Sequence, residues 1–189
     1  FRRELEGASQ PLATDTDAAR QITKPYFFQF RESLWRSQKL FFGTSSEMRL
    51  EFQHASRKLP SQRALYLGGA NTVRGYPESD YLADSGILAN FDLLVPSYFF
   101  PKDWQLPYSK IPLREQVKLV GFFDQGYGRL RGPSRLESPD RYLAGVGGGL
   151  RIRVYEAITA RLELGFAVGN DPLNDASDHQ FHFRLGVDI

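Results

Sequence analysis

The chain has 189 residues, a formal net charge of +2 and no cysteine. Its length fits one domain, residues 1–189, and its nearly balanced charge gives no argument for binding nucleic acid. The absence of cysteine excludes disulfides and thiolate metal sites, and His54, His179 and His182 lack the spacing of metal ligands. We therefore expect no metal ion and no other cofactor.

Alternating apolar and polar residues predict an all-β protein of eight strands. The segments are residues 1–8, 26–35, 41–56, 86–96, 117–127, 142–154, 158–168 and 178–189. The first is weak because Arg3 interrupts its apolar side. Strands of about 9 to 15 residues are long enough to cross a bilayer at the usual tilt.

The connections between these segments alternate in length. Long loops are predicted at residues 9–24, 61–85, 129–140 and 169–178, and short turns at 36–39 and 155–157. Only 97–113 departs from this order; it is rich in aromatic residues and Pro, and is either an ordinary loop or a membrane-interface belt. Alternating loop length favours an outer-membrane barrel, although the alternation alone leaves a soluble barrel or sandwich open.

One loop carries an unusual arginine. Residues 67–76, LGGANTVRGY, set Arg74 among glycines that allow the backbone to fold back on itself. Its guanidinium has five donors and needs acceptors elsewhere. Either Arg74 is a solvated surface residue, or carboxylates on the strands hold it.

Five motifs together carry a family resemblance. They are LGG to VRGY at 67–76, GILANFDLLVP at 86–96, FFDQG at 122–126, GVGGGLR at 145–151 and the aromatic-rich last strand. In this order they resemble the barrel of the superfamily of BamA, TamA, the two-partner-secretion transporters and the patatin-fused barrels. The resemblance covers residues 65–189. It implies a 16-stranded barrel in the usual members, of which this chain is the second half.

The resemblance also implies that the motif Val73, Arg74, Gly75 and Tyr76 folds into the barrel lumen. An unpaired buried ion costs several kcal/mol, so Arg74 needs a partner there. Asp124 and Asp92 lie on the polar faces of the strands that follow the loop, although the family commonly has Glu at the second position. Gly86 and Gly126 lie on the same faces and leave room for the loop.

The last strand ends the chain on apolar residues. Its apolar face comprises Phe181, Phe183, Leu185, Val187 and Ile189. We expect this face to contact lipid.

The resemblance implies a non-enzymatic barrel of the bacterial outer membrane that inserts or translocates polypeptides, or lipids. The alternative is a structural, anchoring or passive-pore barrel without client-handling domains; the family's N-terminal periplasmic domains have no counterpart in these residues. The sequence contains no Gly-x-Ser-x-Gly motif, the pattern that would have pointed to a hydrolytic enzyme. The expected partners are outer-membrane lipids and client polypeptides, with no nucleic acid.

Strand edges in lipid must be paired. We therefore expect the first and last strands to close an eight-stranded barrel within one chain. The seam between them is the expected contact in a homodimer.

Overall fold

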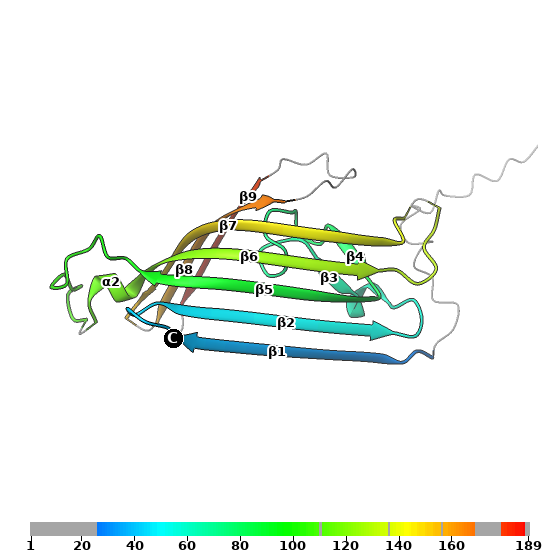
Figure 1. Cartoon of the computed structure of the whole chain (residues 1–189), viewed down its shortest axis with the longest axis horizontal. Helices are drawn as coiled ribbons and strands as arrows, with labels where there is room; N and C mark the ends of the chain where they lie inside the picture. The colour runs from blue at the N-terminus through cyan, green and yellow to red at the C-terminus, as the bar shows by residue number, and fades with distance from the viewer. Residues whose placement is uncertain (1–25, 110, 136, 156, 169–178, 188–189) are drawn as a thin grey trace, which may run out of the picture.

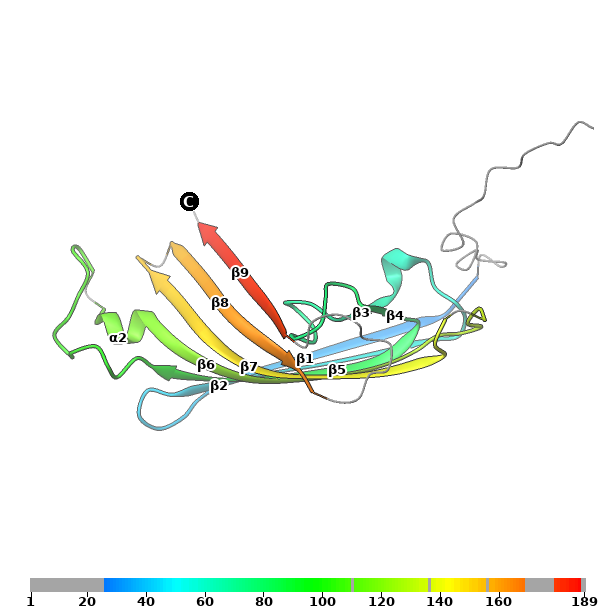
Figure 2. The ribbon, with the colours of Figure 1, turned by 90° about the horizontal axis from the view of Figure 1, so that it is seen from above.

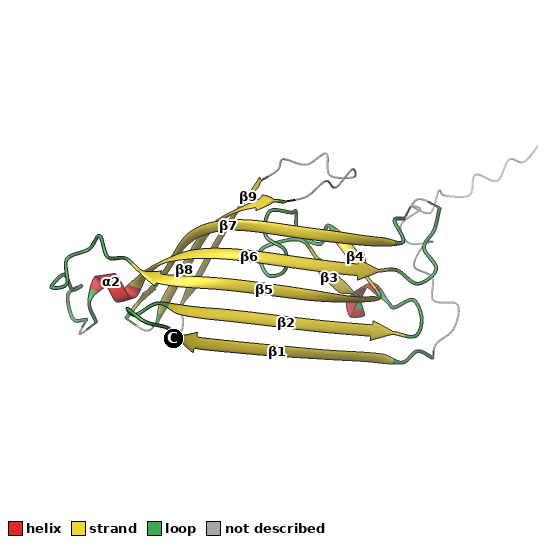
Figure 3. Cartoon of the chain, in the orientation of Figure 1, coloured by secondary structure: helices red, strands yellow, loops and turns green. Residues whose placement is uncertain are grey.

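The computed structural model describes residues 26–109, 111–135, 137–155, 157–168 and 179–187. They form two antiparallel sheets, one of seven strands in the order β1-β2-β5-β6-β7-β8-β9 and one made of β3 and β4 (Figures 1 and 3). The predicted all-β antiparallel fold is confirmed.

Seven long strands build the main sheet. They are β1 (Gln29–Lys39), β2 (Ser45–Ala55), β5 (Ser85–Pro96), β6 (Val117–Arg129), β7 (Asp140–Val154), β8 (Ile158–Ala167) and β9 (His179–Val187). Each corresponds to a segment predicted from the alternation. The eighth predicted strand, residues 1–8, lies outside the described residues.

The turn predicted at residues 36–39 is wrong. β1 continues through these residues to the pair Lys39 and Ser45, and the chain reverses at residues 40–44. Phe42 and Gly43 have φ angles of 55° and 68° there, a left-handed conformation that glycine adopts without strain. A polar run need not be a turn, because an edge strand such as β1 can carry polar residues on both faces.

Two predicted loops contain regular structure. The 61–85 loop holds a 3₁₀ turn, η1 (Ser61–Arg63), and the paired strands β3 (Leu65–Leu67) and β4 (Tyr81–Ala83). The 97–113 connection leads into a single helical turn, α2 (Leu113–Gln116). Among the described residues, no helix is both long and apolar enough to span a membrane.

The main sheet is curved (Figure 2), and register and burial show that its two faces differ in polarity. Register places Phe91 beside Phe123, Phe123 beside Val146, and Val146 beside Phe166. These side chains are between 42% and 45% exposed, whereas Asp124, on the opposite face of β6, is fully buried. The sheet therefore hides its polar side and exposes its apolar side, the reverse of a soluble sandwich.

A small apolar core lies between the concave face and the β3–β4 segment (Figure 2). It consists of Leu65, Leu67, Val73, Tyr76, Tyr81, Ala83, Leu88, Leu130 and Leu143. Packing of this core fixes residues 65–83 against β5, β6 and β7, and thereby positions Arg74 over the sheet.

β1 and β9 are the two edges of the seven-stranded sheet. Pairing of the last strand with residues 1–8 would close the sheet, but those residues lie outside the described part of the chain. The predicted single-chain closure and the homodimer seam thus stay predictions.

Candidate functional site

The loop between β3 and β4 begins with a tight turn stabilised by its own backbone. Thr72 donates its hydroxyl hydrogen to the carbonyl oxygen of Gly68 at 2.7 Å, and Gly69 donates its N–H to Val73 at 3.2 Å. The chain then passes Arg74 and turns at Gly75, whose φ is 105°. A side chain at Gly75 would be strained, so the motif needs glycine there.

Arg74 makes its closest set of contacts with Asp124 of β6. Its Nε and Nη2 donate to the two carboxylate oxygens, each at 2.7 Å, and its backbone N–H donates to Oδ2 at 3.0 Å. Arg74 is 4% exposed and Asp124 0%. This is a bidentate pair of charge-assisted hydrogen bonds, which are roughly twice as strong as neutral ones.

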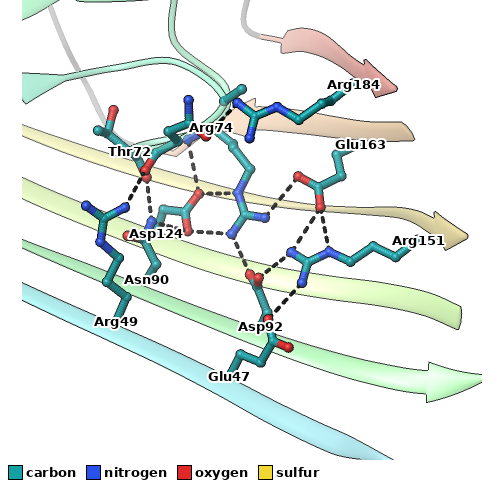
Figure 4. A network of polar contacts seen from close by, with 12 residues as sticks. Glu47, Arg49, Thr72, Arg74, Asn90, Asp92, Asp124, Arg151, Glu163 and Arg184 are labelled. Carbon is teal, nitrogen blue, oxygen red and sulfur yellow. Dashed lines mark hydrogen bonds and ion pairs between the residues drawn. The ribbon is translucent and has the colours of Figure 1, made fainter. Parts of the chain in front are cut away.

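Two more carboxylates complete the shell around the same guanidinium (Figure 4). Nη2 donates to Asp92 of β5 at 2.5 Å, and Nη1 donates to Glu163 of β8 at 3.1 Å. The structure thus brings together Arg74, Asp124 and Asp92 as predicted, and adds Glu163.

Arg151 of β7 is a second cation in this network (Figure 4). It donates to Asp92, to Glu163 at 3.1 Å and to Glu47 of β2 at 3.0 Å. Asp92 and Glu163 therefore bridge the two guanidinium groups. The network links five strands, β2, β5, β6, β7 and β8, to the loop, so the loop is held across the sheet and not at a single strand.

Neutral groups satisfy the remaining positions around Asp124. Asn90 donates to Asp124 at 2.8 Å and to the carbonyl oxygen of Thr72 at 2.5 Å. The Phe122 ring lies 3.6 Å from the Arg74 guanidinium carbon, a cation–π contact. We call Arg74, Asp124, Asp92, Glu163, Arg151, Asn90 and Phe122 the arginine cluster.

The Arg74 guanidinium stays protonated in this loop. Burial by itself lowers the pKa of the guanidinium, but hydrogen bonds and charges of Asp124 and Asp92 outweigh it and raise the pKa above its ordinary value. Arg74 is therefore a permanent cation, and the cluster acts as an electrostatic clamp.

Close approach of the loop depends on glycines. A methyl group at Gly126 would lie 2.9 Å from Val73, and one at Gly86 would lie 2.9 Å from Leu65. Both glycines were predicted to leave this room. Two others were missed: a methyl at Gly145 would overlap the Arg74 carbonyl oxygen, and one at Gly165 would lie 2.6 Å from the Gly75 nitrogen.

The other predicted site residues lie in different surroundings. Val73 and Tyr76 are buried in the apolar core. Phe181, Phe183, Leu185 and Val187 are exposed on the convex face of β9, away from the cluster, and Ile189 lies outside the described residues.

Sequence reasoning missed Glu163, Arg151 and Asn90 as cluster members. Each lies on the polar face of its strand, so the alternation could have nominated them. Their position along the sheet depends on register, such as Glu163 opposite Gly149, which the alternation does not define. Within the described residues, no group of three or more His, Asp or Glu side chains is arranged to hold a metal ion.

An antiparallel sheet with an apolar outer face and a polar inner face has the pattern of a membrane-spanning β-sheet. A family model, haemolysin secretion/activation protein ShlB/FhaC/HecB, matches residues 15–152. The chain belongs to this family. No curated protein matches the chain significantly.

The match agrees with the predicted superfamily and with its two-partner-secretion branch. It gives no support for BamA or TamA in particular, and it does not establish that the chain is the second half of a barrel. The family is one of outer-membrane transporters for protein secretion. The matched residues include Arg74, Asp92, Asp124 and Arg151.

Proposed function

We propose that this chain is part of a barrel that translocates a client polypeptide across the bacterial outer membrane. Its main sheet forms part of the barrel wall, and residues 67–76 form a loop on the inner side. The family description supports secretion over membrane insertion. The observation that carries the proposal is the arginine cluster, which holds residues 67–76 on the concave side of a sheet whose convex side is apolar.

The two faces of the sheet have different proposed roles. The convex face presents Phe91, Phe123, Val146 and Phe166 to acyl chains, and the concave face offers charged and small residues to a passing chain. The clamped loop lies across the concave face and narrows the space beside that face through which a client chain can pass. A client thus passes beside a loop whose position depends on four carboxylates and two guanidinium groups.

The proposal includes the partners expected from the sequence. Outer-membrane lipids cover the convex face, and client polypeptides contact the concave face. The residues bind and guide a chain and do not react with it, so the protein is proposed to be no enzyme. The carboxylates Asp92, Asp124 and Glu163 are engaged by guanidinium groups, which leaves them poorly suited as proton-transfer groups.

The test is secretion by cells that lack the gene and carry either the wild-type copy or Asp124→Asn. We expect the deletion to abolish export of the client into the medium and Asp124→Asn to reduce it strongly, with the outer-membrane protein content unchanged. Asp103→Asn, at an exposed carboxylate of the 97–112 connection, is the matched control and should secrete normally.

Two results would contradict the proposal. A general fall in outer-membrane proteins would indicate a role in insertion. Normal secretion without the gene would indicate the structural, anchoring or passive-pore alternative.

A further inference from the structure

A row of four cations crosses the concave face. The sheet register places Lys118 of β6 opposite Arg151 of β7, Arg151 opposite Arg161 of β8, and Arg161 opposite Arg184 of β9. Like charges directly opposite each other destabilise a sheet. Four adjacent strands nevertheless carry a positive side chain at the same level, and we call these residues the cation row.

The acids near the row are already engaged. Glu47 and Asp92 pair with Arg151, and Glu163 pairs with both Arg151 and Arg74. Arg161 is exposed and lies between two other guanidinium groups in register. Arg184 is also exposed, and donates one hydrogen bond to the Asn71 side chain at 2.9 Å. Within the described residues, Arg161 has no ion pair of its own, because the carboxylates that act on its charge, Glu163 and Glu47, pair with Arg151.

All four members line one cavity of about 810 Å³. The cavity lies between the concave face and the segment that carries Tyr108, Ser109 and Gln116. Among its described lining residues, five side chains are cationic and only Glu47 and Glu115 are acidic. A roomy space with an excess of cations attracts anions, and rings of Arg and Lys have this effect in pores.

The row also has the dimensions of a peptide site. Neighbouring strands are about 4.8 Å apart, so four of them extend the row over roughly 14 Å. Alternate side chains of an extended peptide are about 6.7 Å apart. Two or three carboxylates of an acidic segment can therefore meet the row at once.

We infer that the cation row is a binding site for acidic segments of the translocated polypeptide. The inference rests on the proposed function, because a barrel that passes polypeptide brings such segments to the concave face. Carboxylates bound there would remove the repulsion between Arg151, Arg161 and Arg184. The cation row adjoins the arginine cluster and shares Arg151 with it, whereas Lys118, Arg161 and Arg184 belong to the row alone.

The experiment measures binding of a pentaglutamate peptide to the purified, detergent-solubilised protein by calorimetry. Arg161→Gln should lower the affinity about fivefold, and the double variant with Arg184→Gln about 20-fold. Arg161→Lys should keep most of the affinity. Arg31→Gln removes a charge from the concave face of β1 outside the cavity and should leave the affinity unchanged.

A second measurement needs no variant. Raising KCl from about 0.05 M to about 0.5 M should weaken pentaglutamate binding to the wild-type protein strongly, because screening shortens the range of charge attraction. Inorganic phosphate serves as the probe for a small-anion site.

Three outcomes would overturn the inference. The first is that the wild-type protein shows no salt-sensitive binding of pentaglutamate, the second is that the double variant binds pentaglutamate as tightly as the wild type does, and the third is that phosphate binds tightly where the peptide does not bind. Binding is measured on purified protein and the proposed function as secretion by cells, so either can fail while the other holds.

Discussion

Two regions of the concave face use arginine in opposite ways. In the arginine cluster, Arg74 is buried and contacts three carboxylates, with apolar packing beneath the loop. In the cation row, Arg161 and Arg184 are exposed at a cavity and lie beside other cations. A polar inner face can thus hold a loop where its charges balance and leave a cavity open where they do not.

Breaking the cluster should have the largest effect. Asp124→Ala leaves Arg74 as a buried cation with weaker compensation, and loss of one partner of a buried pair costs about 3–5 kcal/mol. Urea unfolding in detergent micelles measures the free energy of unfolding. Asp103→Ala, at an exposed carboxylate, should change it by less than about 0.5 kcal/mol. Equal effects of the two substitutions would mean that the clamp does not stabilise the fold.

Leu185→Arg tests whether the convex face contacts lipid and the concave face is the inner one. Leu185 is 59% exposed on the convex face of β9, where an arginine at the bilayer midplane costs about 2–4 kcal/mol. Gln180→Arg, on the concave side of the same strand, should cost far less. The yield of each variant that folds into lipid vesicles after dilution from urea measures both costs. Similar folding yields for the two variants would contradict the assignment of the convex face to lipid.

Gly145→Ala should loosen the loop without removing a charge. The added methyl would overlap the Arg74 carbonyl oxygen, and overpacking of this kind costs about 1–3 kcal/mol. Limited trypsin digestion should then cleave after Arg74 faster than in the wild type. Gly121→Ala is the matched control, because a methyl there has no atom within 4 Å; faster cleavage in both variants would point to a general loosening of the sheet.

The smallest effect is expected at the cation row. Arg184 donates to Asn71 at 2.9 Å from an exposed position, and exposed contacts contribute about 0 to 1 kcal/mol. Arg184→Gln should therefore change the free energy of unfolding by less than about 1 kcal/mol, while it weakens peptide binding. A loss of stability as large as that of Asp124→Ala would place Arg184 in the structural clamp.

Much of this protein could be predicted from local pattern. Strand alternation is a local property, because side chains of successive residues point to opposite faces, and it predicted seven long strands and their apolar sides. The motif glycines and Arg74 indicated a loop that needs carboxylates, and Asp92 and Asp124 were correctly selected by the faces on which they lie.

The turn between β1 and β2 shows where local pattern failed. Residues 36–39 are polar, and only pairing with Ser45 to Met48 makes them strand. Likewise, β3 and β4 are three residues each and too short to give a periodic signal.

By itself, the sequence determined which residues of each strand share a face and that Arg74 requires anionic partners, because both follow from backbone geometry and from the chemistry of a guanidinium. Tertiary structure alone decided that Glu163 and Arg151 join Asp124 at one point, and that Lys118, Arg151, Arg161 and Arg184 form one row. The reason is register: it is set by hydrogen bonds between strands far apart in the chain, and a shift of two residues would preserve every face while separating these charges.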